Sequence, residues 1–465
     1  MFLNVFLFAT FNASFIVWGS FFISALILLV IIIYHLYFEK NYSPFLSSYI
    51  VFTVLFFLVA PITQIDSFFG IKNPKFVTLF PYREDLVIYA NGLISLFNII
   101  FIIFYIQLKK ALPVVRSKSI NKKNKKILPL TIFTILVLSI IVFIISYDFI
   151  LEEFSRPSWV KSKTSIMMLL TWKKVLFMIP FGGILLCFQY FKKGNKNKSN
   201  YINIIFFLCL LIVILFWFKN PFTEKRNALG PIYISLIFLF IPKILNTNIK
   251  MLSFLFFSMI ILFPLSAIVT HSDATFLQIY SNPWILIQQM KGGGITEAFA
   301  TLNYDAFANI MATIDYVNKY GFSYGYQFLG GILFFIPRSI WESKPLSTGQ
   351  LVGEHLINDY GFSFSNLSNP LVSESFINFG LIGVILTAII LAYILIRMIL
   401  WLENDDYLKK IMAFYLAMHL VFFLRGDFTN GYSYYIGTLF GVIIIPKMIE
   451  YLIKQLTFIK KDARG

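Results

Sequence analysis

Long apolar runs recur along this chain and constrain its fold more than any other feature. A run of about 20 apolar residues is long enough to cross a bilayer as a helix. We expect such helices at residues 15–38, 45–62, 86–108, 128–150, 175–191, 201–218, 228–247, 251–270, 376–400, 409–424 and 435–453. The segment from Met1 to Thr10 is also apolar and adds either a twelfth crossing or an interfacial helix. Because the first residues contain no basic n-region, we expect no cleavable signal peptide.

The composition supports the same class of fold. Of the 465 residues, 58% are hydrophobic and only 13% are charged, and the mean hydropathy is +0.78. A soluble domain is closer to about half apolar and a quarter charged. The sequence therefore predicts an all-α, polytopic integral membrane protein with about 11–12 transmembrane helices and one large external loop.

The distribution of basic residues predicts the orientation of these spans. Lys and Arg gather in the connections at residues 109–126 and 192–198 and in the tail at 460–464, which should therefore be cytoplasmic. The net charge of +17 then reflects topology and attraction to anionic lipid headgroups rather than nucleic-acid binding. The remaining connections should face the periplasm or the cell exterior, namely 63–85, 151–174, 219–227, 271–375 and 425–434.

Several cations lie on connections that we expect to be external, where Lys and Arg are normally sparse. They are Arg83, Arg156, Lys173, Lys174, Lys225, Arg226, Arg338, Lys344 and Arg425. Two explanations are open. Their long side chains can simply snorkel at the membrane interface, or they can bind an anionic ligand, since arginine in particular suits bidentate phosphate recognition.

The longest polar interruption divides the chain into three parts. Residues 1–270 hold about eight spans, residues 271–375 form the large external loop, and residues 376–465 hold about three spans and a cytoplasmic tail. Within the loop, Thr296 to Asn318 shows apolar residues at helical spacing, which predicts an amphipathic helix lying on the membrane. Ile332 to Ile336 is too short to cross, so a re-entrant hairpin is expected before Pro337.

The stretch from Ile336 to Gly349 places two cations, Arg338 and Lys344, in this loop. The block Pro337-Arg338-Ser339-Ile340-Trp341 with Lys344-Pro345, followed by Leu371-Val372-Ser373-Glu374-Ser375-Phe376-Ile377-Asn378-Phe379-Gly380, resembles the O-antigen polymerase (Wzy-type) family. Arg338 and Gly349 match the arginine, ten residues, glycine pattern described for such enzymes. A second copy of that pattern is absent, because Ile237 stands at the corresponding distance from Arg226.

The resemblance implies an integral-membrane glycosyltransferase of GT-C-like architecture that polymerises surface polysaccharide without a nucleotide sugar. Such an enzyme transfers the growing glycan from undecaprenyl diphosphate to the non-reducing sugar of the next lipid-linked repeat unit, and a chain-length regulator is its expected partner. Cations at membrane level would then bind the diphosphate, and the candidates on the external side are Arg338, Lys344, Arg226, Arg425 and Lys225.

The attacking sugar hydroxyl needs a base, for which Glu374, Glu354, His355 and Asp359 are candidates. Glu374 begins a span, where it can act as a base, as a partner of the helix N-terminus, or as both. His355 is either the base or a solvated loop residue. No pair of His, Asp or Glu has metal-ligand spacing, so we expect neither a metal nor another cofactor.

Two alternative functions are weighed against polymerisation. An O-antigen ligase has similar topology but centres on a loop histidine followed by an amide residue, which His355-Leu356 does not match. A flippase or other transporter should show two related halves and short external loops, whereas this chain shows neither.

Overall fold

The computed structural model describes residues 8–111, 127–155, 166–192, 198–221, 223–262, 278, 281–282, 284 and 299–462. Within these ranges every element is helical apart from one isolated bridge between Lys75 and Pro81. Nine helices in the described part are long and apolar enough to cross a membrane, and two shorter apolar helices accompany them. These observations confirm the all-α, polytopic membrane fold.

The first half of the chain supplies most of the spans. They are built from α2 (Phe15–Ile33), α3 (Pro44–Val54), α4 (Ala60–Asp66), α5 (Glu84–Lys110), α6 (Ile127–Ile145), α8 (Ile166–Lys174), α9 (Ile179–Lys192) and α10 (Lys198–Phe218). The short helix α7 (Tyr147–Ser155) follows α6. Three short helical segments connect these helices. The segment η1 (Tyr34–Phe38) continues α2, η2 (Leu55–Val59) joins α3 to α4, and η4 (Leu176–Met178) joins α8 to α9.

The two shorter apolar helices are α11 (Arg226–Phe240) and α12 (Asn248–Phe257), the second extended by η6 (Ser258–Leu262). The α11 helix is shorter than the predicted span 228–247, because Ile241 leaves the helical conformation before Pro242 and a short turn, η5 (Pro242–Ile244), follows. Residues 263–270 of the predicted span 251–270 lie outside the described residues, as do Met1 to Leu7 of the apolar N-terminus.

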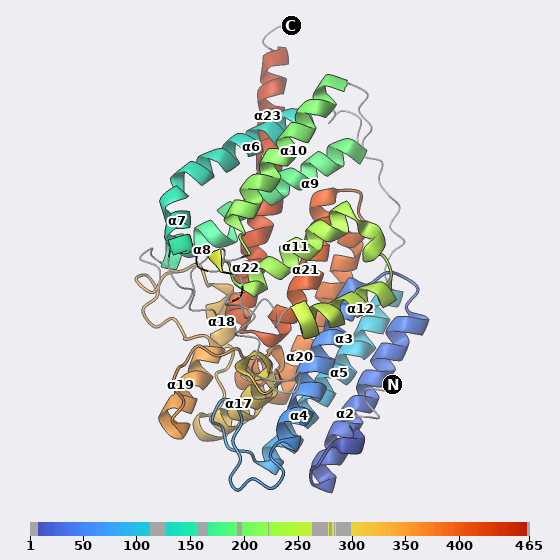
Figure 1. Ribbon diagram of the computed structural model, residues 1–465, viewed down its shortest axis with the longest axis vertical. Helices are drawn as coiled ribbons and strands as arrows, with labels where there is room; N and C mark the ends of the chain where they lie inside the picture. The colour runs from blue at the N-terminus through green and yellow to red at the C-terminus, as the bar shows by residue number, and fades with distance from the viewer. Residues whose placement is uncertain are drawn as a thin grey trace.

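The last three spans are α20 (Leu371–Leu402), α21 (Tyr407–Arg425) and the run formed by α22 (Phe428–Leu439), η8 (Phe440–Ile444) and α23 (Ile445–Asp462). In Figure 1, α2, α3, α4 and α5 lie together with α20, whereas α6, α9 and α10 lie with α23 in a second group. The α21 helix packs against α3, α9, α11 and α20 and so connects the two groups.

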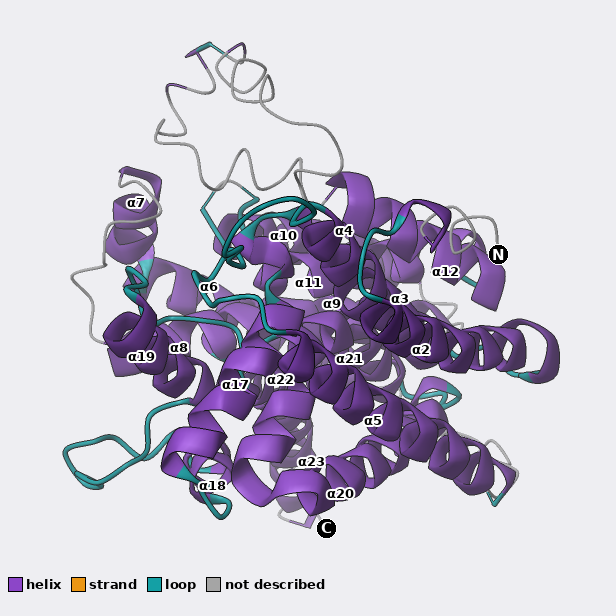
Figure 2. Cartoon of the chain, turned by 90° about the horizontal axis from the view of Figure 1, so that it is seen from below, coloured by secondary structure: helices purple, strands orange, loops and turns teal. Residues whose placement is uncertain are grey.

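The polar segment, defined here as residues 299–370, contains η7 (Leu302–Tyr304), α17 (Ala306–Tyr320), α18 (Tyr326–Ile332) and α19 (Thr348–Tyr360). Its helices pack on α5, α20 and α22, as Figure 2 shows from below. The α17 helix differs from the expected surface helix, because all its residues from Ala306 to Ile314 are buried. It is therefore a core helix, and Thr296 to Ala298 of the predicted helix lie outside the described residues.

Candidate functional site

Three helices of the polar segment and the C-terminal spans begin at one place. They are α19, α20 and α22, whose first residues are Thr348, Leu371 and Phe428. The first turn of a helix leaves backbone N–H groups without intrahelical partners, and the helix dipole adds partial positive charge there. A buried carboxylate can accept hydrogen bonds from these N–H groups and can also balance the partial positive charge. Two buried carboxylates lie where the three helices begin, those of Glu374 and Asp427.

Glu374 joins the three helices directly. Its Oε2 accepts a hydrogen bond from the Thr348 hydroxyl at 2.5 Å, and its Oε1 accepts from the Phe428 amide at 2.9 Å. The residue is 2% exposed. Glu374 therefore lies near a helix start as expected, but its carboxylate accepts hydrogen bonds from the first residues of α19 and α22 and not from the N-terminus of its own helix.

Asp427 completes the carboxylate junction, which we define as Thr348, Gly349, Glu374, Asp427 and Phe428. Its Oδ1 accepts from the Thr429 amide at 2.9 Å and caps α22, and its Oδ2 accepts from the Gly349 amide at 3.0 Å. The sequence reasoning missed Asp427. Its position between two apolar runs and just before a helix start was the available signal.

Gly349 is required by close packing at this junction. An added Cβ at Gly349 would stand 2.1 Å from the carbonyl oxygen of Leu367, and one at Gly353 would stand 2.3 Å from that of Ser365. Both distances are far below van der Waals contact, so α19 can rest on this backbone only with glycine at the two positions. The glycine of the arginine–glycine pattern thus has a packing role.

Arg338 and Lys344 both bond to the loop that contains them. Lys344 Nζ donates to the carbonyl oxygens of Phe334 and Ile336 at 2.8 and 2.9 Å. The Arg338 guanidinium donates to the carbonyl oxygens of Lys344 and, at 3.2 Å, Pro345. Partial burial, and then the charge of Arg338, lower the pKa of Lys344. The Arg338 side chain remains exposed, so it can meet a ligand from outside the loop.

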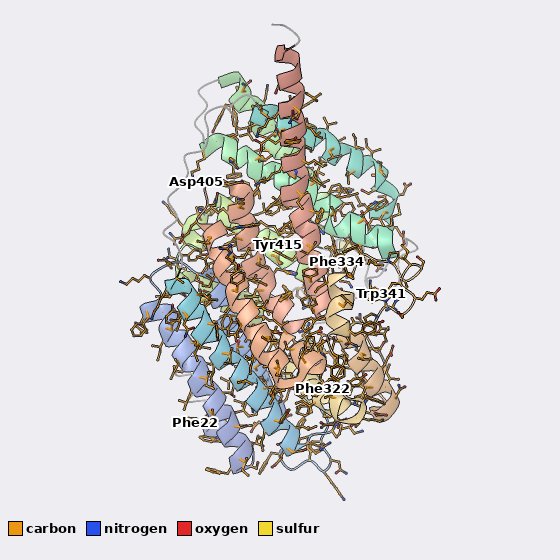
Figure 3. All side chains as sticks on the ribbon, turned by 180° about the vertical axis from the view of Figure 1, so that it is seen from behind. Phe22, Phe322, Phe334, Trp341, Asp405 and Tyr415 are labelled. Atoms are coloured by element: carbon orange, nitrogen blue, oxygen red, sulfur yellow. The ribbon has the colours of Figure 1, made fainter. Side chains whose placement is uncertain are left out.

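This loop lies against α22. The rings of Phe334 and Tyr432 meet edge to face with centroids 6.2 Å apart. In Figure 3, the labelled Phe334 and Trp341 lie on the side of the polar segment, as does Phe322, whereas Asp405 lies at the opposite end of the spans. The residues just before the 336–349 loop therefore contact α22, the helix whose first amide group donates to Glu374.

Arg226 and Arg425 form a second cluster with the start of the polar segment. Arg425 Nη2 donates to the carbonyl oxygen of Leu302 at 2.7 Å and lies 3.2 Å from Asp305 Oδ1. Arg226 Nη2 donates to Asn303 Oδ1 at 3.1 Å. We call Arg226, Asn303, Asp305 and Arg425 the arginine cluster.

The arginine cluster brings two guanidinium groups together. The two guanidinium groups lie close enough to repel each other. Burial raises the pKa of Asp305, and the charge of Arg425 opposes that rise. The buried Nε of Arg425 has no hydrogen-bond partner among the residues that the structure describes, so it can donate to a ligand. Lys225 precedes Arg226 and is exposed. Thus two of the predicted phosphate ligands meet although 199 positions separate them in sequence.

The remaining predicted base candidates lie on α19. His355 is 3% exposed; its Nε2 lies 3.1 Å from Asp315 Oδ2, and its Nδ1 lies 2.8 Å from Asp359 Oδ2 in an ion-pair contact. Glu354 is half-buried and accepts from the Gln350 amide group at 3.2 Å. His355 is therefore neither in a loop nor solvated, but holds α19 against α17.

Residues 357–455 match the family model described as O-antigen polysaccharide polymerase Wzy. No curated protein and no solved structure matches the chain. The matched range confirms the family resemblance seen in the sequence and contains Glu374, Arg425 and Asp427. The block around Arg338 and the residue Arg226 lie before it.

Proposed function

We propose that this chain joins lipid-linked oligosaccharide repeat units into surface polysaccharide, because residues 357–455 match the family model described as O-antigen polysaccharide polymerase Wzy. The donor is the growing glycan on undecaprenyl diphosphate, and the acceptor is the non-reducing sugar of the next lipid-linked unit. The bond between the anomeric carbon and the diphosphate oxygen breaks, a glycosidic bond forms, and the lipid diphosphate leaves.

The observation that carries this proposal is the arginine cluster at the helix ends. A departing diphosphate develops negative charge, which preorganised cations stabilise. Arg425 lies 3.2 Å from the Asp305 carboxylate, and Arg226 donates to the neutral side chain of Asn303, so two guanidinium groups lie near each other where a phosphate could bind. Arg338, Lys344 and Lys225 are further proposed ligands, with the exposed Arg338 side chain approaching from the 336–349 loop.

Glu374 is the proposed base. The Thr348 hydroxyl already donates a hydrogen bond to this carboxylate, and an acceptor sugar hydroxyl would take the place of Thr348 and pass its proton to Oε2. The same carboxylate also holds three helices together, so base and structural roles coexist in this proposal. Glu354 and His355 are the alternative bases, with His355 oriented by Asp315 and Asp359.

We place the protein in the bacterial cytoplasmic (inner) membrane with residues 271–375 facing the periplasm or exterior. Charge stabilisation by arginine and lysine makes a metal-independent reaction our proposal, and a chain-length regulator is the proposed protein partner. The family match and the distribution of basic residues support these proposals.

The test is complementation of a strain that lacks its own polymerase, followed by gel analysis of the surface polysaccharide. Polymerisation predicts that the ladder returns with this chain and that its loss leaves single repeat units on the acceptor. Arg338→Ala should also leave only the one-repeat band while the protein remains inserted. If deletion removes all glycan from the acceptor, ligation or flipping replaces polymerisation as the function.

A further inference from the structure

Lys174 is a buried cation that the proposed reaction has not yet used. It is the last residue of α8 and is 5% exposed. Its Nζ donates to the Ser433 hydroxyl of α22 and lies 4.3 Å from the centre of the Tyr434 ring. Gly437 admits this contact, because an added Cβ there would stand 2.7 Å from the Cβ of Lys174.

Two neighbouring lysines have carboxylate partners, whereas Lys174 has none among the described residues. Lys219 Nζ lies 3.3 Å from Glu224 Oε2, and Lys173 pairs with Glu153 and, at 3.7 Å, with Glu224. In the part of the chain that the structure describes, no carboxylate lies within ion-pair distance of Lys174. Lys225 and Lys219 repel its charge, and the more distant Asp427 attracts it.

A buried ammonium group without a counter-ion is costly, because it loses hydration and gains no compensating charge. The cation–π contact with Tyr434 and one neutral hydroxyl replace only part of that hydration. An anionic group between Lys174 and Lys225 would supply the missing counter-charge. The Ser433 hydroxyl donates its one hydrogen to the Asn430 carbonyl at 3.0 Å, and rotation of the hydroxyl would direct that hydrogen to a phosphate oxygen instead.

We propose that Lys174 and Ser433, with Lys225, form a phosphate-binding subsite for the diphosphate of a polyprenyl-linked substrate. This inference rests on the proposed function, which supplies the lipid diphosphate. Lys225 directly precedes Arg226, so the subsite continues the arginine cluster along the start of α11. Cations from α8, α11 and α21 then contact one extended anionic group.

The experiment measures binding of farnesyl diphosphate to the full-length protein in phosphatidylcholine nanodiscs. The variants are Lys174→Met, Lys174→Arg and Ser433→Ala, and Lys192→Met is the control because Lys192 is an exposed lysine paired with Asp405 at the opposite end. One lost charge-assisted hydrogen bond predicts that Lys174→Met binds about ten- to a hundredfold more weakly. Lys174→Arg should retain most affinity, and Lys192→Met should bind like the wild type.

If Lys174→Met binds farnesyl diphosphate with wild-type affinity, the proposal is overturned. If that variant also polymerises more slowly than the wild type, Lys174 takes part in the reaction and not in substrate binding. If Lys174→Met does not fold, Ser433→Ala must show weaker binding for the subsite to stand. A second arm replaces the nanodisc lipid with phosphatidylglycerol. An effect of Lys174→Met seen only there assigns the site to lipid headgroups and rejects a substrate site.

Binding and polymerisation are separate readouts. A wild-type protein that binds farnesyl diphosphate through Lys174 but restores no ladder contradicts the proposed function and leaves the subsite intact. A protein that restores the ladder while Lys174→Met binds normally contradicts the subsite alone.

Discussion

Replacing Glu374 with glutamine separates the structural and chemical roles of this carboxylate. A glutamine can keep both contacts, because its carbonyl oxygen can accept from the Phe428 amide and its NH2 group can donate to the Thr348 hydroxyl. We therefore expect Glu374→Gln to change the free energy of unfolding by at most about 1 kcal/mol, the net value of one ordinary hydrogen bond. Glu374→Ala leaves two buried groups unpaired and should cost about 2–6 kcal/mol.

The structural and the chemical role of Glu374 predict different polymerisation rates for the Glu374→Gln variant. Loss of a general base lowers a rate by about 10²–10⁴, so Glu374→Gln should be as stable as the wild type yet slow by that factor. The assay pairs denaturant unfolding in detergent with the rate at which purified lipid-linked units are polymerised. Thr348→Val is the matched control, since it removes one contact of the carboxylate but leaves the proposed base.

Two results would refute this reasoning. A stable Glu374→Gln variant that polymerises at nearly the wild-type rate excludes Glu374 as the base. A Glu374→Gln variant as unstable as Glu374→Ala shows that the junction needs the negative charge itself, and not only its two hydrogen bonds.

Arg425→Met should destabilise the protein by about 3–5 kcal/mol, because it leaves the buried carboxylate of Asp305 unpaired. Adding Asp305→Asn should restore stability in unfolding measurements without restoring the polysaccharide ladder. An active double variant would contradict a phosphate-binding role for Arg425. The hydrogen bond from His355 holds the pKa of Asp315 below its usual value, so the stability from this group is complete above about pH 4 and is lost as the pH falls through the lowered pKa. Acid titration should therefore show the stability difference between Asp315→Asn and the wild type shrinking below about pH 4, and a constant difference would contradict this. Gly349→Ala should cost about 1–3 kcal/mol or more by overpacking, measured by unfolding, and a neutral result would show that α19 can move away from the backbone beneath it.

The sequence predicted the spans well because hydropathy and length alone decide whether a helix suits a bilayer. It predicted less about helices whose surroundings are other parts of the protein. The residues of α17 follow an amphipathic pattern, but α5, α19 and α20 pack around it, and its polar residue Asp315 bonds to His355 and Tyr360 instead of water. A pattern of polar and apolar residues does not distinguish water from a buried polar partner.

The candidate site could likewise be predicted only in part from the sequence. Glu374 and the cations Arg226 and Arg425 could be selected from the sequence, because a charged residue at the end of an apolar run is unusual. The contacts of Glu374 with Thr348 and Phe428 could not be predicted, because each joins segments from different helices. The same is true of the ion pair between Arg425 and Asp305. Arg338 and Lys344 were correctly placed in one loop by sequence proximity, yet their bonds to that loop's own carbonyls required the structure.

A break within α20 separates the segment that contains Glu374 from the part of the same helix that spans the membrane. Phe379 and Gly380 leave the helical conformation, and Gly380 has a φ of +60°, which favours glycine. The break is held from outside, because Gly325 packs against the Phe379 ring so closely that an added Cβ would stand 2.4 Å from it. Residues before the break are bonded to α19 and α22, whereas residues after it cross the membrane. The spanning part can therefore adjust its tilt to the bilayer while Glu374 keeps its position, as its proposed role as the base would require.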